Sequence, residues 1–106
     1  MKIISIFLLF FSVGAFSEQT FFGKVDRIEV VNYESGAAYV YIENANFTEC
    51  PKKTNWCAID FSTKASDQMY SAVLAAKLGG HKVGVTSNAC WSKGQYPRCW
   101  KVRLKD

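Results

Sequence analysis

The sequence predicts a single, mainly β domain with one helix, and three observations support this prediction. Short segments rich in β-branched and aromatic residues alternate with turn-forming residues along most of the chain. Only one segment, Lys64–Leu78, has its apolar residues at helical spacing. With one helix, the chain lacks the alternating strands and helices that a doubly wound fold needs.

The first seventeen residues have the pattern of a secretory signal. The apolar run Ile3–Phe11 follows a single lysine and is too short to span a bilayer. Small residues at Ala15 and Ser17 match the positions that a signal peptidase reads. We therefore expect a signal peptide over residues 1–17 and a mature domain over residues 18–106, in a secreted or periplasmic location.

The mature domain is small and only mildly basic. Without the lysine of the signal, twelve of the thirteen Lys and Arg residues remain, against nine Asp and Glu, and the charges are interspersed. This excess is too weak to indicate nucleic-acid binding. No second apolar segment approaches membrane-spanning length, so we expect no membrane span.

The first predicted strand, Phe21–Tyr33, is long and changes phase. Phe21 and Val25 share one parity, whereas Ile28 and Val30 share the other. A change of parity within a strand indicates an extra residue, which we place near Asp26-Arg27. A strand that bends there can pair in two sheets at once.

Two shorter strands are predicted next. A turn over residues 34–36 leads into Ala37–Asn44, whose aliphatic residues face one way while Tyr39 and Tyr41 face the other. After a loop, Trp56–Phe61 has the composition of a third strand.

The helix is predicted over Lys64–Leu78, with Met69, Val73 and Leu74 packed on the strands. A hydroxyl side chain is expected to cap its start, and Gly79-Gly80 to end it. The candidate caps are Ser62, Thr63 and Ser66.

Two strands complete the chain, at His81–Thr86 and Cys99–Lys105. Alternation in the last strand predicts that Trp100, Val102 and Leu104 face the core. Three strands, a helix and two strands is the element order of the OB-fold, a five-stranded Greek-key barrel. We therefore predict an OB-fold-like barrel with the order β-β-β-α-β-β.

Four cysteines in an oxidising compartment predict two disulfides, and four cysteines allow three pairings. We favour the local pairs Cys50–Cys57 and Cys90–Cys99, because each brackets a short turn-like stretch. The spacing leaves the other two pairings open. No metal site is expected, since there is no Cys-x-x-Cys and the one histidine, His81, is far from the cysteines in sequence.

Three segments, Cys57–Phe61, Met69–Gly80 and Lys82–Val85, form a series. They combine a cysteine-containing strand, an alanine-rich helix with a glycine stop, and a Val-x-Val strand. This series resembles the B subunits of bacterial A–B toxins of the pertussis and subtilase type. In that group five OB-fold subunits form a ring that binds host glycans and carries an enzymatic A subunit. The resemblance implies a binding subunit in a homo-oligomer, and no binding motif of the group aligns with this chain.

The candidate ligand contacts are aromatic and cationic residues outside the predicted core. Four crowd the segment between Cys90 and Cys99, and two point outward from the second strand. They are Trp91, Lys93, Tyr96, Arg98, Tyr39 and Tyr41. Sugars stack on indole and phenol rings, and Lys or Arg can bind a carboxylate. The alternative is structural, because rings commonly cover a disulfide or pair across strands.

The sequence indicates neither an enzyme nor a cofactor. It has one histidine, no nucleophile elbow and no metal-spaced cluster. The leading hypothesis is a secreted, non-enzymatic subunit that binds glycans as an oligomer, with an A subunit as a further partner. The alternative is a monomeric secreted or periplasmic module that binds or inhibits another protein, and a secreted hydrolase is the third hypothesis.

Overall fold

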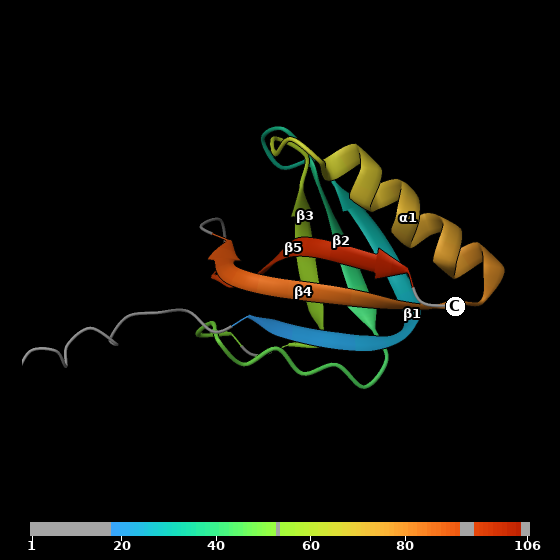
Figure 1. Cartoon of the computed structure of the whole chain (residues 1–106). Coiled ribbons are helices and arrows are strands. Elements are labelled where there is room, and N and C mark those ends of the chain that lie inside the picture. Colours follow the sequence, from blue (N-terminus) through green and yellow to red (C-terminus); the bar gives the residue numbers. More distant parts are fainter. Residues whose placement is uncertain (1–17, 53, 92–94, 105–106) are drawn as a thin grey trace, which may run out of the picture.

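The computed structural model describes residues 18–52, 54–91 and 95–104, and Figure 1 shows their arrangement. The predicted signal peptide, residues 1–17, lies outside the described residues. Five strands and one helix follow one another in the predicted order. The elements are β1 (Gln19–Val31), β2 (Ala37–Ile42), β3 (Trp56–Asp60), α1 (Ser66–Gly79), β4 (Lys82–Trp91) and β5 (Tyr96–Leu104).

The strands are hydrogen-bonded in a closed order, β1-β2-β3-β5-β4. Neighbouring strands are antiparallel, except that β3 and β5 are parallel. α1 connects β3 to β4 and packs against β1, β3, β4 and β5, as Figure 1 shows. These features confirm the predicted mainly β class with a single helix.

β1 is long enough to pair with two neighbours because it bends at a bulge. Residues 19–24 pair with β4, and residues 25–31 pair with β2. The register with β2 skips Asp26, which confirms the irregularity predicted near Asp26-Arg27. The extra residue increases the local twist, and this lets one strand close the ring.

α1 buries a narrower face than the sequence predicts. Val73 and Ala76 are buried in the core, and Met69 and Tyr70 pack partly against it. Leu74 was expected on the same face but is 36% exposed. It lies about 100° around the helix from Val73, beyond the stripe that meets the strands.

The backbone, rather than a hydroxyl side chain, sets both ends of α1. The N-cap residue is Ala65 and no side chain caps the first turn, so the predicted hydroxyl cap is wrong. Instead, the Ser66 hydroxyl donates a hydrogen bond back to the Thr63 carbonyl (2.9 Å). At the other end, Gly80 adopts a left-handed φ of 70°, which confirms the predicted glycine stop.

The disulfides join distant parts of the chain. Cys50 is bonded to Cys90 and Cys57 to Cys99, so the predicted pairs Cys50–Cys57 and Cys90–Cys99 are wrong. Topology explains the difference, because β3 and β5 are neighbours and bring the Cα atoms of Cys57 and Cys99 to 5.1 Å. The bridges span 40 and 42 residues. Loops of this length correspond to roughly 4 kcal/mol of stabilisation each in the chain-entropy model.

A second bulge turns Trp100 out of the core. The register between β4 and β5 skips Trp100, while Cys99 and Val102 on either side face the core. Trp100 is 48% exposed, so the prediction that it is a core residue is wrong. Alternation does not continue across a bulge, and this is the physical reason for the error. Leu104, also predicted to face the core, is exposed at the end of β5.

Candidate functional site

The outer face of β2 carries tyrosines where alternation predicts them. Val40 and Ile42 are fully buried, whereas Tyr39 and Tyr41 alternate with them, face outward and are half-buried. Trp56 on β3 lies opposite Tyr41 in the strand register. The pairing of β2 with β3 therefore places aromatic side chains from two strands on one face.

The β4–β5 hairpin brings further rings to this face, because both strands are longer than predicted. Cys90 pairs with Pro97 and Trp91 with Tyr96. The segment predicted as a disulfide loop is therefore the tip of a hairpin. There, the Tyr96 ring lies against Trp56, with ring centroids 4.4 Å apart.

Trp56 is the centre of a continuous set of ring contacts. Its ring centroid lies 4.4 Å from that of Tyr39 and 5.6 Å from that of Tyr41. Trp91 meets two of the tyrosines edge to face, at 5.7 and 6.1 Å. We call this set the aromatic surface. Its members are Tyr33, Tyr39, Tyr41, Trp56, Trp91 and Tyr96. Each such contact contributes about 0.5–1.5 kcal/mol beyond area burial, so the rings hold one another in place.

Trp91 is the buried member of the aromatic surface and lies beneath the other rings. It is 3% exposed and packs with Ala37 and Ala58, whose small side chains leave room for the indole. Its indole N–H donates a hydrogen bond to Oδ2 of Asp60 (3.1 Å), so its polar atom is satisfied. A ligand on this face therefore meets the rings around Trp91, and Trp91 positions those rings.

Two cations border the aromatic surface. The guanidinium carbon of Arg27 lies 4.1 Å from the centroid of the Tyr41 ring, and Nζ of Lys52 lies 5.0 Å from that of Tyr96. Arg27 is also within 3.6 Å of a carboxylate oxygen of Glu29, and the Tyr41 hydroxyl donates to the other oxygen (3.3 Å). The face thus has an aromatic centre bordered by two cations, one of which is paired with the Glu29 carboxylate.

Burial raises the pKa of the Tyr39 and Tyr41 hydroxyls above the usual value of 10.0. Neighbouring tyrosines add to the effect of burial at Tyr39, and the Glu29 carboxylate adds to it at Tyr41. Both hydroxyls are therefore protonated at neutral pH, when each can donate a hydrogen bond.

The other two predicted contacts do not join the aromatic surface. Lys93 lies outside the described residues. Arg98 lies further along β5, where its guanidinium carbon is 5.3 Å from the centroid of the Trp100 ring. Arg98 and Trp100 line a cleft of about 320 Å³ between the start of α1 and β5.

Trp56 is the central ring, yet it was not among the predicted contacts. The sequence does contain one signal for Trp56. Cys57 is buried, and alternation along β3 then turns the neighbouring Trp56 to the outer face. Its neighbours could not be inferred, since they depend on the register of β2 with β3 and on the path of β5. Tyr33, Arg27 and Lys52 were missed for the same reason.

The described residues offer no arrangement for a metal ion. No three His, Cys, Asp or Glu side chains among residues 18–52, 54–91 and 95–104 are placed to hold one. His81 lines a hollow of about 260 Å³ together with Asp26 and Glu43. In the part of the chain that the structure describes, no helix is long and apolar enough to cross a membrane.

Comparison of the chain with protein-family models, with curated proteins and with solved structures gave no match. The described part of the chain carries two surface features that bring aromatic and cationic side chains together, the aromatic surface and the cleft between α1 and β5.

Proposed function

We propose that this protein is a secreted, non-enzymatic subunit that binds glycans through its aromatic surface and acts as a homo-oligomer. The observation that carries the proposal is the position of Trp56, which contacts Tyr39, Tyr41 and Tyr96 on the outer face of the strands. The flat C–H faces of sugars pack on such rings. Their hydroxyls accept hydrogen bonds from tyrosine O–H and from cationic side chains. Rings that are already fixed lose little entropy when a ligand binds.

An OB-fold assignment fits this choice of surface. The closed strand order and the helix between β3 and β4 match that architecture. OB-folds bind oligosaccharides and oligonucleotides on the face of strands 2 and 3 and on the loops beside it, including the loop between strands 4 and 5. The aromatic surface lies on β2, β3, the β4–β5 hairpin and, through Tyr33, the turn between β1 and β2, which are the same positions.

Secretion is proposed from two independent features. Residues 1–17 have the pattern of a signal peptide. All four cysteines are in disulfides, and such bonds persist in oxidising compartments.

Oligomerisation gives a shallow surface useful affinity. A single site of this kind binds one sugar weakly, at about millimolar Kd, because it buries little area and must order a flexible ligand. Several sites presented together raise the avidity by roughly 10²–10⁴ without new contacts. The resemblance to toxin B subunits implies that several subunits form a ring and present their sites together. It also implies an enzymatic A subunit as partner. Exposed apolar side chains such as Val30 and Leu78 are candidates for contacts between subunits.

A glycan array tests the proposal with the mature, disulfide-bonded protein and its Trp56→Ala variant. We expect wild-type binding to an immobilised glycan and at least a tenfold loss in Trp56→Ala. Trp100→Ala is the matched control, because it removes an outer-face tryptophan that is not part of the aromatic surface. Tyr96→Leu is a second variant in case Trp56→Ala unfolds, and circular dichroism verifies the fold of each.

Light scattering of the same samples gives the oligomeric mass. A monomer that binds no glycan on the array would overturn the proposal in favour of a protein-binding module. Tyrosine, tryptophan and arginine are also the residues that dominate protein–protein hot spots, so the aromatic surface suits that alternative as well.

A further inference from the structure

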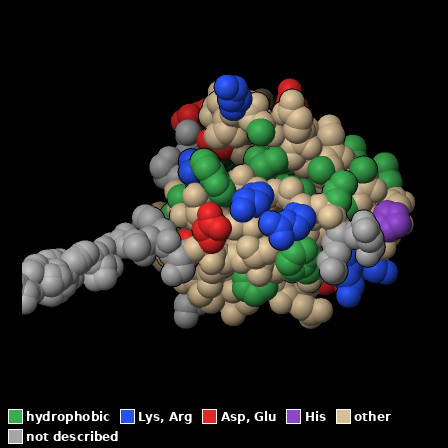
Figure 2. Space-filling model, in the orientation of Figure 1, with side chains coloured by type: hydrophobic (Ala, Val, Ile, Leu, Met, Phe, Trp, Pro, Cys, Tyr) green, Lys and Arg blue, Asp and Glu red, His purple; other side chains and the backbone are tan. Residues whose placement is uncertain are grey.

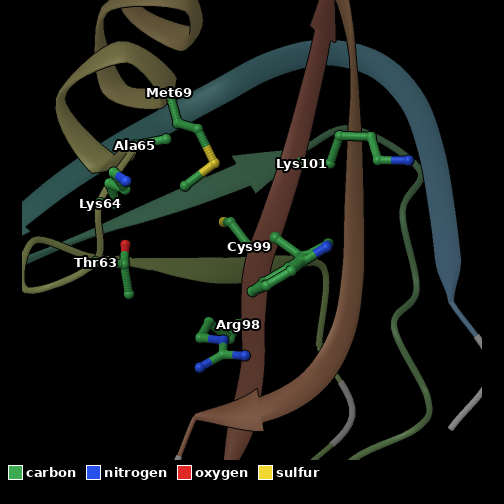
Figure 3. Close-up of a pocket in the computed structure, with 8 residues that line it drawn as sticks. Thr63, Lys64, Ala65, Met69, Arg98, Cys99 and Lys101 are labelled. Atoms are coloured by element: carbon green, nitrogen blue, oxygen red, sulfur yellow. The ribbon is translucent and has the colours of Figure 1, made fainter.

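The cleft between α1 and β5 differs in chemistry from the aromatic surface. Residues 63–65 and Met69 form one side, and residues 98–101 form the other. Figure 3 shows Met69 reaching from α1 toward Cys99 on β5. The bulge in β5 turns Trp100 outward, which makes its ring part of the cleft. Without that bulge, Trp100 would point into the core, as its parity predicts.

Positive charge gathers at this cleft. Its lining includes Lys64, Arg98 and Lys101, and none of its described lining residues is acidic. The face of the molecule in Figure 2 shows Lys and Arg side chains next to hydrophobic side chains over β5. Opposite charge on a ligand would therefore be favoured at this position.

Arg98 has an unused hydrogen-bond donor. Its Nε is buried, and no described residue accepts a hydrogen bond from it. Its guanidinium carbon lies 5.3 Å from the centroid of the Trp100 ring. A buried donor without an acceptor is unfavourable, so the protein gains stability if the Arg98 side chain turns this N–H toward an anionic oxygen in the cleft. The planar guanidinium is suited to a carboxylate or sulfonate because it can donate two parallel hydrogen bonds.

The remaining lining is mostly apolar. Its apolar members are Ala65, Met69, Cys99 and Trp100. Methionine adapts to irregular ligands and contacts aromatic rings favourably. A hydroxyl-rich sugar would find few hydrogen-bond partners against these walls, so this lining does not suit the ligand proposed for the aromatic surface.

We propose that this cleft binds a small amphipathic anion, free in solution, that carries a carboxylate or sulfonate on a flat apolar ring. Arg98 binds the anionic group, and Lys64 and Lys101 add charge at the rim. The apolar ring lies between Met69 and Trp100. This site is independent of glycan binding, so either proposal can fail without the other.

The probe is 2-naphthoate, with its neutral counterpart 2-naphthylmethanol and with acetate as an anion that lacks the ring. Titration of the mature protein is followed by NMR of the indole N–H signals and of the labelled Met69 methyl group. The chain has three tryptophans, so Trp56 and Trp91 serve as internal references for Trp100. We expect 2-naphthoate to shift the Trp100 and Met69 signals and to bind at least tenfold more tightly than the alcohol, with no shift from acetate.

Arg98→Gln tests the role of the guanidinium, and Arg103→Gln is the matched control. Both lie on β5 and lose one positive charge, but Arg103 is exposed and does not line the cleft. Loss of a charge-assisted hydrogen bond predicts roughly ten- to hundredfold weaker 2-naphthoate binding in Arg98→Gln. Binding in Arg103→Gln should stay within about twofold of wild type. Lys101→Gln replaces Arg98→Gln if the latter does not fold.

Three results would overturn the proposal. They are equal affinity for 2-naphthoate and the alcohol, equal loss in Arg98→Gln and Arg103→Gln, and shifts that centre on Trp56 instead of Trp100. If 2-naphthoate shifts Trp100 but the array shows no glycan binding, the cleft stands and the proposed function fails. If the array shows glycan binding but the Trp100 signal does not shift with 2-naphthoate, the proposed function stands and the cleft proposal fails.

Discussion

The aromatic surface and the cleft share strand β5, yet they use the same residue types in opposite ways. In the aromatic surface, Trp56 has rings on three sides, and Arg27 is placed between Tyr41 and Glu29. In the cleft, Trp100 is 48% exposed, and the buried Nε of Arg98 has no acceptor among the described residues. The first region is held together by its own contacts. In the second, the Arg98 Nε has no acceptor among the described residues, and the Trp100 ring, although it contacts Arg98, is half exposed.

This difference shows that an arginine next to an aromatic ring does not by itself define a binding site. What differs is whether the partners of each group lie within the protein. Strand register provides those partners at the aromatic surface, and a bulge removes Trp100 from the core at the cleft. Three predictions test how far the contrast extends, in order of decreasing effect.

The largest effect should come from Trp91, with Trp100 as the matched control. Trp91→Ala leaves a cavity under the aromatic surface and should lower the free energy of unfolding by about 3–5 kcal/mol. Trp100→Ala should change it by less than about 1 kcal/mol, because half of that side chain is already exposed. Guanidinium unfolding under non-reducing conditions measures both. Equal losses would remove the contrast between the two regions.

A smaller loss is expected at Asp60. One carboxylate oxygen accepts the Trp91 indole N–H, and the other accepts hydrogen bonds from the backbone and hydroxyl of Ser62. Asp60→Ala leaves a buried indole N–H unpaired and should cost roughly 1–3 kcal/mol. Asp67→Ala, which removes an exposed carboxylate from the first turn of α1, is the control and should cost less than about 1 kcal/mol. If the two variants are equally stable, the hydrogen bond does not hold Trp91 in place.

The smallest effect concerns alkaline pH. The pKa values of Tyr39 and Tyr41 are raised in the folded protein, so the folded state holds these protons more tightly than the unfolded state. The corresponding stability is complete below pH 10 and is lost as the pH rises through the raised values. Absorbance at 295 nm should show two late phenolate steps that disappear in Tyr39→Phe and Tyr41→Phe. Tyr70→Phe, on α1, is the control and should leave both steps unchanged. If the Tyr39 hydroxyl instead ionises at the pH of an exposed tyrosine, the aromatic surface is open to water.

Local patterns predicted most of the fold. The element order, the bulge in β1, the outward tyrosines of β2 and the glycine that ends α1 all follow from residue periodicity within one segment. Such features depend on neighbours a few residues away, which the sequence displays directly. Of the six predicted contacts, the structure brings four into the aromatic surface, namely Tyr39, Tyr41, Trp91 and Tyr96.

The errors arose where distant segments meet. Cys57 pairs with Cys99 because β3 and β5 are neighbours in the closed ring, and no local spacing encodes that contact. Alternation places Trp100 in the core because it does not register the bulge that shifts parity. It cannot show that Trp91 is buried, because the residues that cover Trp91 come from other strands.

The sequence by itself determined a mainly β domain with one helix, the outward tyrosines of β2 and the presence of two disulfides, and it predicts a signal peptide. Only the tertiary structure decided which cysteines bond, which tryptophan is buried and which arginine Nε has no acceptor among the described residues. The physical reason is that periodicity fixes the direction of a side chain relative to its own strand, whereas burial and satisfied hydrogen bonds depend on the strand that pairs beside it.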